Sequence, residues 1–494
     1  MKHFYFKSAI LAVAFFSFTT ISPAQFQTGD DIDGESTSDR SGSAISMPNS
    51  TTIAIGAPRN DGNGGNAGHV RIFSYNGSSW TQKGADLDGD AAGDLFGSTV
   101  SMPDENTLAV GAPENNENGT VAGMVKVFEW NGTEWSQKGQ SLLGDVPSEF
   151  FGDIFGSSVS MPDANTIAVG APWNNANGFR AGQVKIFDWD GNAWNQRGDD
   201  IYDGPATYSG SVVSMPSIDV VAIASQGGSA GLGHVRIFEW NGAEWIQKGE
   251  NITGETTGDL SGDAISMPDE NTIAIGTENN DGGAPDAGHV RIFEWSGSEW
   301  VQKGAAINGE LEGDKSGNSV SMPDANTVAI GSSLNDDNGL QSGHARVFIW
   351  NGSEWQQQGA TMIGEATQDQ FGYSVSMPDA STVAVGALQN DGNGNEAGHV
   401  RVFGLSEVSV VSSSVTGNDV LCYPNPANEM VTIAFNAFEN VSLVQIISLD
   451  GKVLKETNNI MGSKLNLELP FPAGMYLIKI ETDSGSNFIS LMKY

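Results

Sequence analysis

Pairs of carboxylates recur along this chain at a spacing that could bind a metal ion. A glycine is followed by one acid and, four residues later, by a second; these pairs are Glu35/Asp39, Asp90/Asp94, Glu255/Asp259, Glu310/Asp314 and Glu365/Asp369. Carboxylates and backbone carbonyls supply the oxygen ligands that Ca²⁺ prefers. The pattern therefore predicts Ca²⁺ as a cofactor of these segments. The alternative is that the acids cap turns through their own backbone and remain solvated.

A second candidate site is aromatic. Eleven of the twelve tryptophans occupy two positions of an internal repeat, and only Trp173 lies elsewhere. Phe179 and Arg180 follow in the same polar segment, and Phe150 and Phe151 precede it. Aromatic faces beside one cation suit a contact with a sugar or a peptide. We expect Trp173, Phe179 and Arg180 to bind a ligand; the alternative is that they only pack neighbouring loops together.

Histidine usage argues against most kinds of catalysis. Apart from His3, all histidines stand at one position of the repeat, namely His69, His234, His289, His344 and His399. A residue repeated in this way is expected to be structural. No other histidine is present for a Ser-His-Asp or Cys-His arrangement, and no catalytic residue is identified. Because carboxylates are abundant, a glycosidase-like reaction stays open.

The elements that would position these residues come from a sevenfold repeat. Its marker is Ser-Met-Pro, at intervals of 52–59 residues, with the methionines at Met47, Met102, Met161, Met215, Met267, Met322 and Met377. In unit two, short strands are predicted over 98–102, 107–112 and 124–130 and from Trp135 onward, with Asn131-Gly132 as a hairpin turn. Repeated units of four short strands predict an all-β fold, a seven-bladed β-propeller.

Two features of the array concern its ends and its faces. The last unit stops at Phe403 without a fourth strand, and residues 25–33 align with the fourth-strand segment 80–88. We therefore expect the N-terminal segment to supply the outer strand of the seventh blade. The connections between strands two and three, and between strand four and the next unit, are longer than the other turns. The 2–3/4–1 loop face is therefore the expected working face.

The repeat also resembles a known family. Phe96-Gly97, Gly111-Ala112-Pro113 and Gly123 resemble the FG-GAP repeat of integrin-type β-propellers, over roughly residues 25–405. Such repeats often place a calcium loop between their first two strands. Here only Pro103–Asn106 connects them, which is too short to surround an ion with six to eight oxygens. Any bound metal is then expected in the 4–1 connections.

The N-terminal residues 1–24 have the pattern of a signal peptide. Lys2 and Lys7 precede an apolar stretch over 8–18, and small residues follow, so cleavage is predicted between Ala24 and Gln25. The apolar stretch is too short to span a bilayer, and no other transmembrane segment is expected. The net charge of −37 argues against a nucleic acid or an anionic membrane surface as partner. Cys422 is the only cysteine, which excludes an intrachain disulfide.

The C-terminal residues form a separate module. Residues 406–420 read as a Ser/Val-rich linker, and 421–494 as a small β-sandwich. The matching residues Tyr423-Pro424-Asn425-Pro426, Asp450-Gly451-Lys452-Val453, Gly474-Met475-Tyr476 and Lys493-Tyr494 resemble the type A C-terminal sorting domain of the type IX secretion system. The resemblance implies recognition by that machinery, export from a Gram-negative cell and later removal of the domain. A stalk or a carbohydrate-binding module is the alternative.

The expected function is binding. The sequence is interpreted as a monomeric secreted or cell-surface adhesion protein whose 2–3/4–1 loop face engages an extracellular protein or glycan. One alternative is an extracellular carboxylate-dependent hydrolase or lyase acting on polysaccharide. Another is a structural surface protein without a discrete ligand, because fold alone does not determine function.

Overall fold

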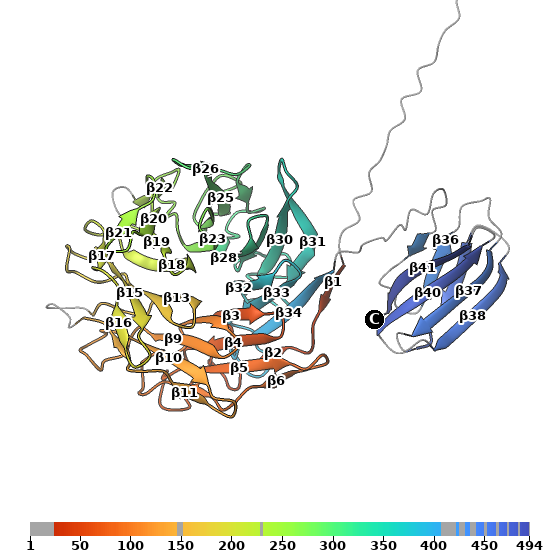
Figure 1. Cartoon of the computed structure of the whole chain (residues 1–494), viewed down its shortest axis with the longest axis horizontal. Helices are drawn as coiled ribbons and strands as arrows, with labels where there is room; N and C mark the ends of the chain where they lie inside the picture. The colour runs from red at the N-terminus through yellow and green to blue at the C-terminus, as the bar shows by residue number, and fades with distance from the viewer. Residues whose placement is uncertain are drawn as a thin grey trace, which may run out of the picture. The chain divides into compact units, whose positions relative to one another are not determined.

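A computed structural model of the chain describes residues 24–145, 152–227 and 231–406 and, in the C-terminal region, 421–423, 430–434, 441–448, 452–460, 464–471, 474–482 and 485–493. The chain divides into two compact units, Gln25–Leu405 and a second that contains Ser406–Tyr494. Both are built from β-strands, and Figure 1 shows the first as sheets set around an axis. In these described ranges no helix is long and apolar enough to cross a membrane.

Repeat unit two shows how one blade is built. Its strands β8 (Thr99–Asp104), β9 (Thr107–Ala112), β10 (Met124–Trp130) and β11 (Trp135–Gln137) pair in this order, and β12 (Leu142–Leu143) also pairs with β10. All of β9 is buried because its side chains alternate between two neighbours. Leu108 packs against the preceding blade and Ala109 against the following one. A short apolar strand covered on both faces is therefore the centre of each blade.

Six further sheets repeat this arrangement. The first has β3 (Ala44–Asn49), β4 (Thr52–Ala57), β5 (His69–Tyr75), β6 (Trp80–Gln82) and β7 (Leu87–Asp88). The third sheet has β13 (Ser158–Asp163), β14 (Thr166–Ala171), β15 (Gln183–Trp189), β16 (Trp194–Gln196) and β17 (Ile201–Tyr202). The fourth sheet has β18 (Ser209–Ser217), β19 (Val220–Ser225), β20 (His234–Trp240), β21 (Trp245–Gln247) and β22 (Ile252–Thr253). The fifth sheet has β23 (Ala264–Asp269), β24 (Thr272–Thr277), β25 (His289–Trp295), β26 (Trp300–Gln302) and β27 (Ile307–Asn308). The sixth sheet has β28 (Ser316–Asp324), β29 (Thr327–Ser332), β30 (His344–Trp350) and β31 (Trp355–Ile363).

The last sheet combines both ends of this unit. It contains β32 (Phe371–Asp379), β33 (Thr382–Ala387) and β34 (His399–Ser406), with β1 (Ala24–Gln27) and β2 (Ile32–Asp33) paired to β34 (Figure 1). The Thr28 amide donates to the Val402 carbonyl at 2.7 Å. The expectation that the N-terminal segment supplies the outer strand is confirmed. Because β1 begins at Ala24, the predicted cleavage before Gln25 would remove its first residue and keep the rest.

The innermost strands form a closed ring. They contact one another in the order β3, β8, β13, β18, β23, β28, β32 and back to β3. The Met102 amide donates to Oγ of Ser46 in the preceding blade at 3.0 Å. The same bond joins the other neighbouring blades, through Met161/Ser101, Met215/Ser160, Met267/Ser214, Met322/Ser266, Met377/Ser321 and Met47/Ser376. The Ser-Met-Pro motif therefore joins each blade to the next, and the all-β propeller fold predicted from the repeat is confirmed.

The first strand of a blade extends further than the sequence predicts. We expected the strand over 98–102 to end at Pro103, but β8 continues to Asp104 with a register shift between Ser101 and Asp104. β8 is the edge strand of its sheet. The bulge takes Pro103 out of the ladder, so its missing N–H leaves no strand pairing incomplete.

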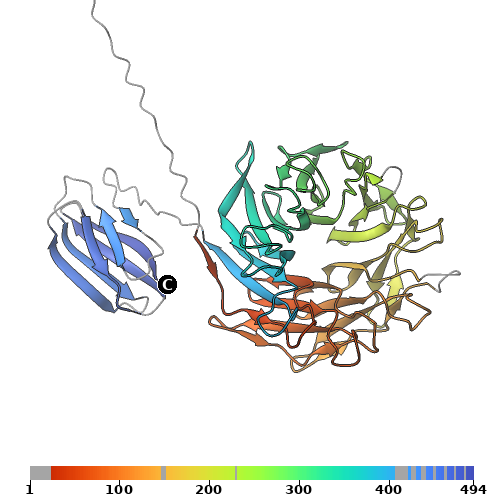
Figure 2. The same cartoon turned by 180° about the vertical axis from the view of Figure 1, so that it is seen from behind.

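The C-terminal module is a sandwich of two sheets (Figure 2). One sheet has β35 (Leu421–Tyr423), β36 (Met430–Ala434) and β39 (Lys464–Glu468); the other has β37 (Val441–Ser448), β38 (Val453–Ile460), β40 (Gly474–Thr482) and β41 (Gly485–Lys493). Val431, Ile433 and Leu467 of the first sheet share a buried core with Ile446 and Ile478 of the second. This core matches the small β-sandwich that the sequence predicts.

Candidate functional site

The second acid of each predicted calcium pair is buried and bonded within its own loop. Asp94 is 1% exposed, and its Oδ2 accepts hydrogen bonds from the Ala91 amide and from Nδ2 of Asn115, both at 3.0 Å. Asp259, Asp314 and Asp369 are similarly buried, and each accepts two amides of its own loop where Asp94 accepts one. This acid therefore caps the 4–1 loop and ties it to the adjacent 2–3 loop.

The contact between this aspartate and an asparagine recurs around the ring. In the described residues the two partners lie 21 residues apart, in the pairs Asp39–Asn60, Asp94–Asn115, Asp153–Asn174, Asp259–Asn280, Asp314–Asn335 and Asp369–Asn390. Unit four has Thr207 at the aspartate's position, where its hydroxyl donates to the Ala181 and Gly204 carbonyls. Burial raises the pKa of Asp153, and the bond from Asn174 opposes that rise.

The first acid of each pair has a different partner. Asp90 contacts Nζ of Lys126 at 2.6 Å, and Glu310 lies 3.1 Å from Nη1 of Arg346. The same third-strand position supplies the cations that pair with Glu35, Glu255 and Glu365, namely Arg71, Arg291 and Arg401. These first acids are about half exposed, and their guanidinium or ammonium partners are buried along the strand.

The structure thus directs the two acids of a pair to different partners. The first neutralises a strand cation, and the second satisfies backbone and asparagine donors. The turn-capping alternative describes the second acid, with one correction: this acid is buried rather than solvated, because the 2–3 loop covers it. Calcium binding by Asp90, Asp94, Glu255, Asp259, Glu310, Asp314, Glu365 and Asp369 stays a prediction.

Three groups of histidine and acids gather within 4.8 Å in the described part of the chain: Glu35/His69/Asp86, Glu310/Asp337/His344 and Asp31/Asp33/His399. Each also has an arginine two residues after the histidine on the same strand. Arg346 lies 3.1 Å from Glu310, and Arg71 lies 3.5 Å from Glu35. Burial lowers the pKa of His399 to about 4, so it is neutral at pH 7. In the first two groups the arginine pairs with one of the two acids, so these groups are ion-pair networks that hold the loops to the strands; Arg401 pairs with Glu365, outside the third group.

The predicted aromatic cluster is brought together, with one further member. The guanidinium of Arg180 lies 4.6 Å from the Trp173 ring centroid, 5.3 Å from that of Phe179 and 5.8 Å from that of Tyr208. Tyr208 was not foreseen, because it follows the 4–1 loop of the next unit. The aromatic faces are thus in contact with the protein's own cation. Phe179 remains 64% exposed, and Phe150 and Phe151 lie outside the described residues.

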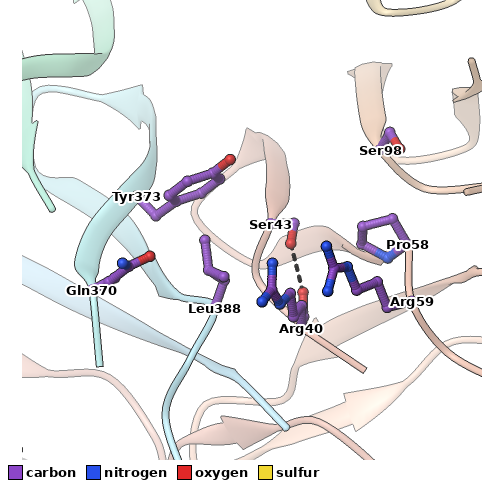
Figure 3. A pocket seen from close by; sticks show the side chains of 8 residues that line it. All are labelled: Arg40, Ser43, Pro58, Arg59, Ser98, Gln370, Tyr373 and Leu388. Atoms are coloured by element: carbon purple, nitrogen blue, oxygen red, sulfur yellow. Dashed lines mark hydrogen bonds between the residues drawn. The ribbon is translucent and has the colours of Figure 1, made fainter. Parts of the chain in front are cut away.

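A pocket opens on the 2–3/4–1 loop face where the last blade meets the first. Figure 3 shows it lined by Arg40, Ser43, Pro58, Arg59, Ser98, Gln370, Tyr373 and Leu388, and its volume is about 240 Å³. Arg40 is held by Glu396, whose Oε2 accepts from Nε and Nη2 at 3.2 and 2.9 Å. Arg59 is exposed, and no carboxylate of the described residues pairs with its guanidinium. The pocket therefore presents positive charge on a strongly acidic protein.

The electrostatics of the pocket extend to neighbouring loops. Partial desolvation and the nearby Glu278 raise the pKa of the Tyr373 hydroxyl, and Arg40 and Arg59 act on it in the opposite direction. Asp263 occupies the position of Tyr373 in unit five. Burial, and then Glu278, raise the pKa of Asp263 to about 7. Both of its oxygens accept hydrogen bonds, from the Glu278 amide and the Gln226 side chain.

Sequence reasoning missed this pocket, although the signal is present. Arg40, Arg59 and Tyr373 each depart from the residues at the same position in other units. At the position of Arg40 the other units have Leu95, Ile154, Tyr208, Leu260, Lys315 and Gln370. Such single departures have no periodicity of their own, and ring closure places unit seven beside unit one.

The residues predicted for processing and sorting are placed only in part. Ala24 and Gln25 lie in β1, and the remainder of the predicted signal peptide is outside the described residues, as are 407–420, Pro424, Asn425, Pro426 and Gly451. Gly474 begins β40, and Tyr476 of the same strand is 7% exposed within the sandwich core.

Two family models match this chain. An FG-GAP repeat matches residues 356–403, and a secretion system C-terminal sorting domain matches residues 421–493. A comparison with curated protein sequences finds no match.

Solved structures of several kinds are similar at low identity. A putative 6-phosphogluconolactonase from Bacteroides uniformis is 10% identical, with 66% of this chain and 86% of that chain covered and a TM-score of 0.47. The β-propeller domain of the Trilobed protease from Pyrococcus furiosus is 10% identical, with coverages of 69% and 90% and a TM-score of 0.38. The GH74 xyloglucanase from Xanthomonas campestris is 10% identical, with coverages of 94% and 75% and a TM-score of 0.43. At these scores the likenesses decide nothing about activity.

The matched models agree with the features described above. The FG-GAP match runs from Gln356 in β31 to Phe403 in β34, and the Ser-Met-Pro bond of this segment recurs between the other neighbouring blades. The sorting-domain match covers the two-sheet sandwich. The chain is therefore a β-propeller with an FG-GAP repeat at residues 356–403, followed by a C-terminal sorting domain that indicates export by the type IX secretion system to the cell surface or the extracellular space.

Proposed function

We propose that this protein is a secreted or surface-displayed binding module. Its 2–3/4–1 loop face engages an extracellular protein or glycan after export by the type IX secretion system. The propeller holds the loops of seven blades on one rigid ring, an arrangement suited to recognition by several loops at once.

One observation carries the proposal. The pocket at the junction of the last and first blades lies on this face, and Arg40, Arg59 and Tyr373 of its lining depart from the repeat. Residues that maintain the scaffold, such as Ser46, Met102 and Asp94, recur from unit to unit. Departures from the repeat gathered around one opening are what a ligand-specific site on a repeat scaffold is expected to have.

Binding of the secreted full-length protein to glycan arrays and to immobilised extracellular-matrix proteins tests this function. We expect binding that decreases when loop-face residues such as Arg59 are replaced and persists when exposed residues of the opposite hairpin turns, such as Ser353, are replaced. Absence of binding to every glycan and protein in both assays would favour the structural surface protein instead.

A hydrolase or lyase is the second candidate function, favoured by Asp263 and Glu278. The pKa of Asp263 is raised to about 7 and that of Glu278 is also raised, both chiefly by burial. A protonated carboxyl beside a second carboxylate is the arrangement that glycosidases use as acid and base. Turnover of a polysaccharide that Asp263→Asn abolishes, without loss of stability, would establish this alternative.

A further inference from the structure

The pocket between the last and first blades also indicates which ligand chemistry it would accept. We propose that it binds the carboxylate of an acidic sugar, a single uronate residue at the end or on a branch of a glycan. This inference rests on the proposed binding function and specifies the ligand of the same face.

The charge of the pocket selects an anion. Arg40, Arg59 and Tyr373 line it together; partial desolvation and the carboxylate of Glu278 raise the pKa of the Tyr373 hydroxyl, and the two arginines lower it. The bond to Glu396 fixes the Arg40 side chain, and Arg59 has no carboxylate partner among the described residues. A guanidinium fork matches the two oxygens of a carboxylate.

The remaining lining suits a sugar ring. Tyr373, which is 44% exposed, and Pro58 provide apolar surface, and Leu388, which is 3% exposed, lies behind them. Gln370 adds polar atoms that a hydroxyl-bearing ligand could use, and the hydroxyls of Ser43 and Ser98, which donate to the Arg40 and Leu95 carbonyls, can still accept a hydrogen bond. Apolar walls with a few converging polar groups are usual for sites that bind small molecules. A bare carboxylate, such as an acidic peptide side chain, would leave these polar groups unused.

The size of the pocket suits one sugar ring. Its volume is about 240 Å³ and it opens to solvent, so one unit of a longer glycan would occupy it while the rest extends outside. The net charge of −37 opposes the approach of densely charged polymers, including nucleic acids, so attraction is confined to the two arginines.

The repeat supplies substitutions that the fold already accepts. Arg40 has φ +56° and the equivalent Leu95 has φ +54°, so Arg40→Leu adds no backbone strain. Arg59→Gln copies Gln389, and Tyr373→Ser copies Ser43 and Ser98. Asn279 stands in unit five at the position that Arg59 has in unit one and Glu114 has in unit two. Asn279→Glu therefore introduces a residue that the repeat already contains, and it lowers the net charge by one, as Arg59→Gln does. Asn279→Glu is therefore the matched control.

Titration of the secreted full-length protein with glucuronate, glucose, acetate and inorganic phosphate, followed by calorimetry and ligand-observed NMR, tests the proposal. We expect glucuronate to bind at least about tenfold more tightly than the other three, since only glucuronate engages both the arginines and the apolar walls. Arg59→Gln, Arg40→Leu and Tyr373→Ser should each weaken glucuronate binding about tenfold or more, while Asn279→Glu leaves it unchanged. Thermal unfolding of each variant checks that the fold is retained.

Four results would overturn the proposal. If glucose binds as tightly as glucuronate, the carboxylate does not contribute to binding. If acetate or phosphate binds as tightly as glucuronate, the sugar ring does not contribute. If Asn279→Glu and Arg59→Gln weaken glucuronate binding equally, the effect comes from the net charge and not from a contact with Arg59. The glycan and matrix-protein arrays could instead identify ligands whose binding is unchanged in Arg59→Gln and Tyr373→Ser. The binding function would then stand, and only the assignment of the ligand to this pocket would fail.

Discussion

Nδ2 of Asn115 donates a hydrogen bond to Oδ2 of Asp94 at 3.0 Å, and both side chains are buried beneath the loop face. The asparagine belongs to the 2–3 loop and the aspartate to the 4–1 loop, so one bond joins the two loops of the proposed working face. Its recurrence around the ring makes this face a preorganised surface rather than a set of independent loops.

Asp94→Ala should destabilise the propeller by about 2–3 kcal/mol, because the Ala91 amide and the Asn115 side chain lose a buried acceptor. Asp90→Ala is the control, and it should cost about 1 kcal/mol or less because it removes only a half-exposed ion pair. Chemical denaturation measures both. Both are measured in EDTA and in millimolar calcium. A calcium-dependent rise in Tm that Asp94→Ala abolishes would support the calcium site instead.

Ser101→Ala should weaken the ring, since the Met161 amide at the centre of the propeller would lose its acceptor. An unsatisfied buried amide costs about 1–3 kcal/mol. Ser136→Ala, which removes an exposed bond to the Glu129 carbonyl, should change stability by less than about 0.5 kcal/mol. Equal denaturation midpoints for the two variants would show that the serine ring does not contribute to stability.

Asp263→Asn should stabilise the protein in a pH-dependent way. The pKa of Asp263 is about 7 in the fold against an ordinary 3.8, so between these values the folded state holds a proton that the unfolded state releases. Stability therefore falls as pH rises through this window and levels off above it. Asp263→Asn has no carboxyl to titrate at this position. Its free energy of unfolding should therefore exceed that of the native chain by at least about 1 kcal/mol at pH 8 and equal it at pH 4.

The geometry of that variant has a precedent. Asn318 stands at the same position in unit six and accepts the Ser333 amide at 3.0 Å, as Asp263 accepts the Glu278 amide at 2.9 Å. Denaturation curves at several pH values give the comparison, with Asp269→Asn at an exposed turn as control. A stability gain that grew toward low pH would contradict the prediction.

Trp173→Ala should lower stability by about 1–2 kcal/mol, because the Arg180 guanidinium loses the aromatic face that lies nearest to it. Phe179→Ala should cost less, since that ring is 64% exposed. Thermal unfolding and array binding are measured together. A loss of ligand binding by Trp173→Ala at unchanged Tm would identify the cluster as a ligand site, as the sequence predicts.

Deletion of residues 421–494 should leave the protein in the periplasm, because the sorting domain that directs export is lost. Cell fractionation and immunoblotting give the readout. Arg59→Gln, a change confined to the propeller, should reach the surface or the medium like the native chain. Normal surface display of the deletion variant would refute the sorting role.

Much of the fold can be read from local patterns. Ser-Met-Pro at regular intervals, Asn131-Gly132 between two tryptophans and the Tyr423–Pro426 segment identify the propeller, its hairpins and the sorting domain, because each depends on residues close together in the chain. Even the outer strand 25–33 is found by aligning it with 80–88. Because the patterns of the propeller repeat from unit to unit, they identify the strands and turns that all blades share.

Only the tertiary structure decided what the loop face presents. Glu255 and Asp259 are neighbours in sequence, yet one faces a strand cation and the other a buried asparagine, which no spacing rule reveals. Arg59 and Tyr373 are far apart along the chain and line one pocket because ring closure brings unit seven beside unit one. The sequence by itself determined the scaffold through local, repeated interactions, whereas the site depends on long-range closure and on where each side chain finds its partner.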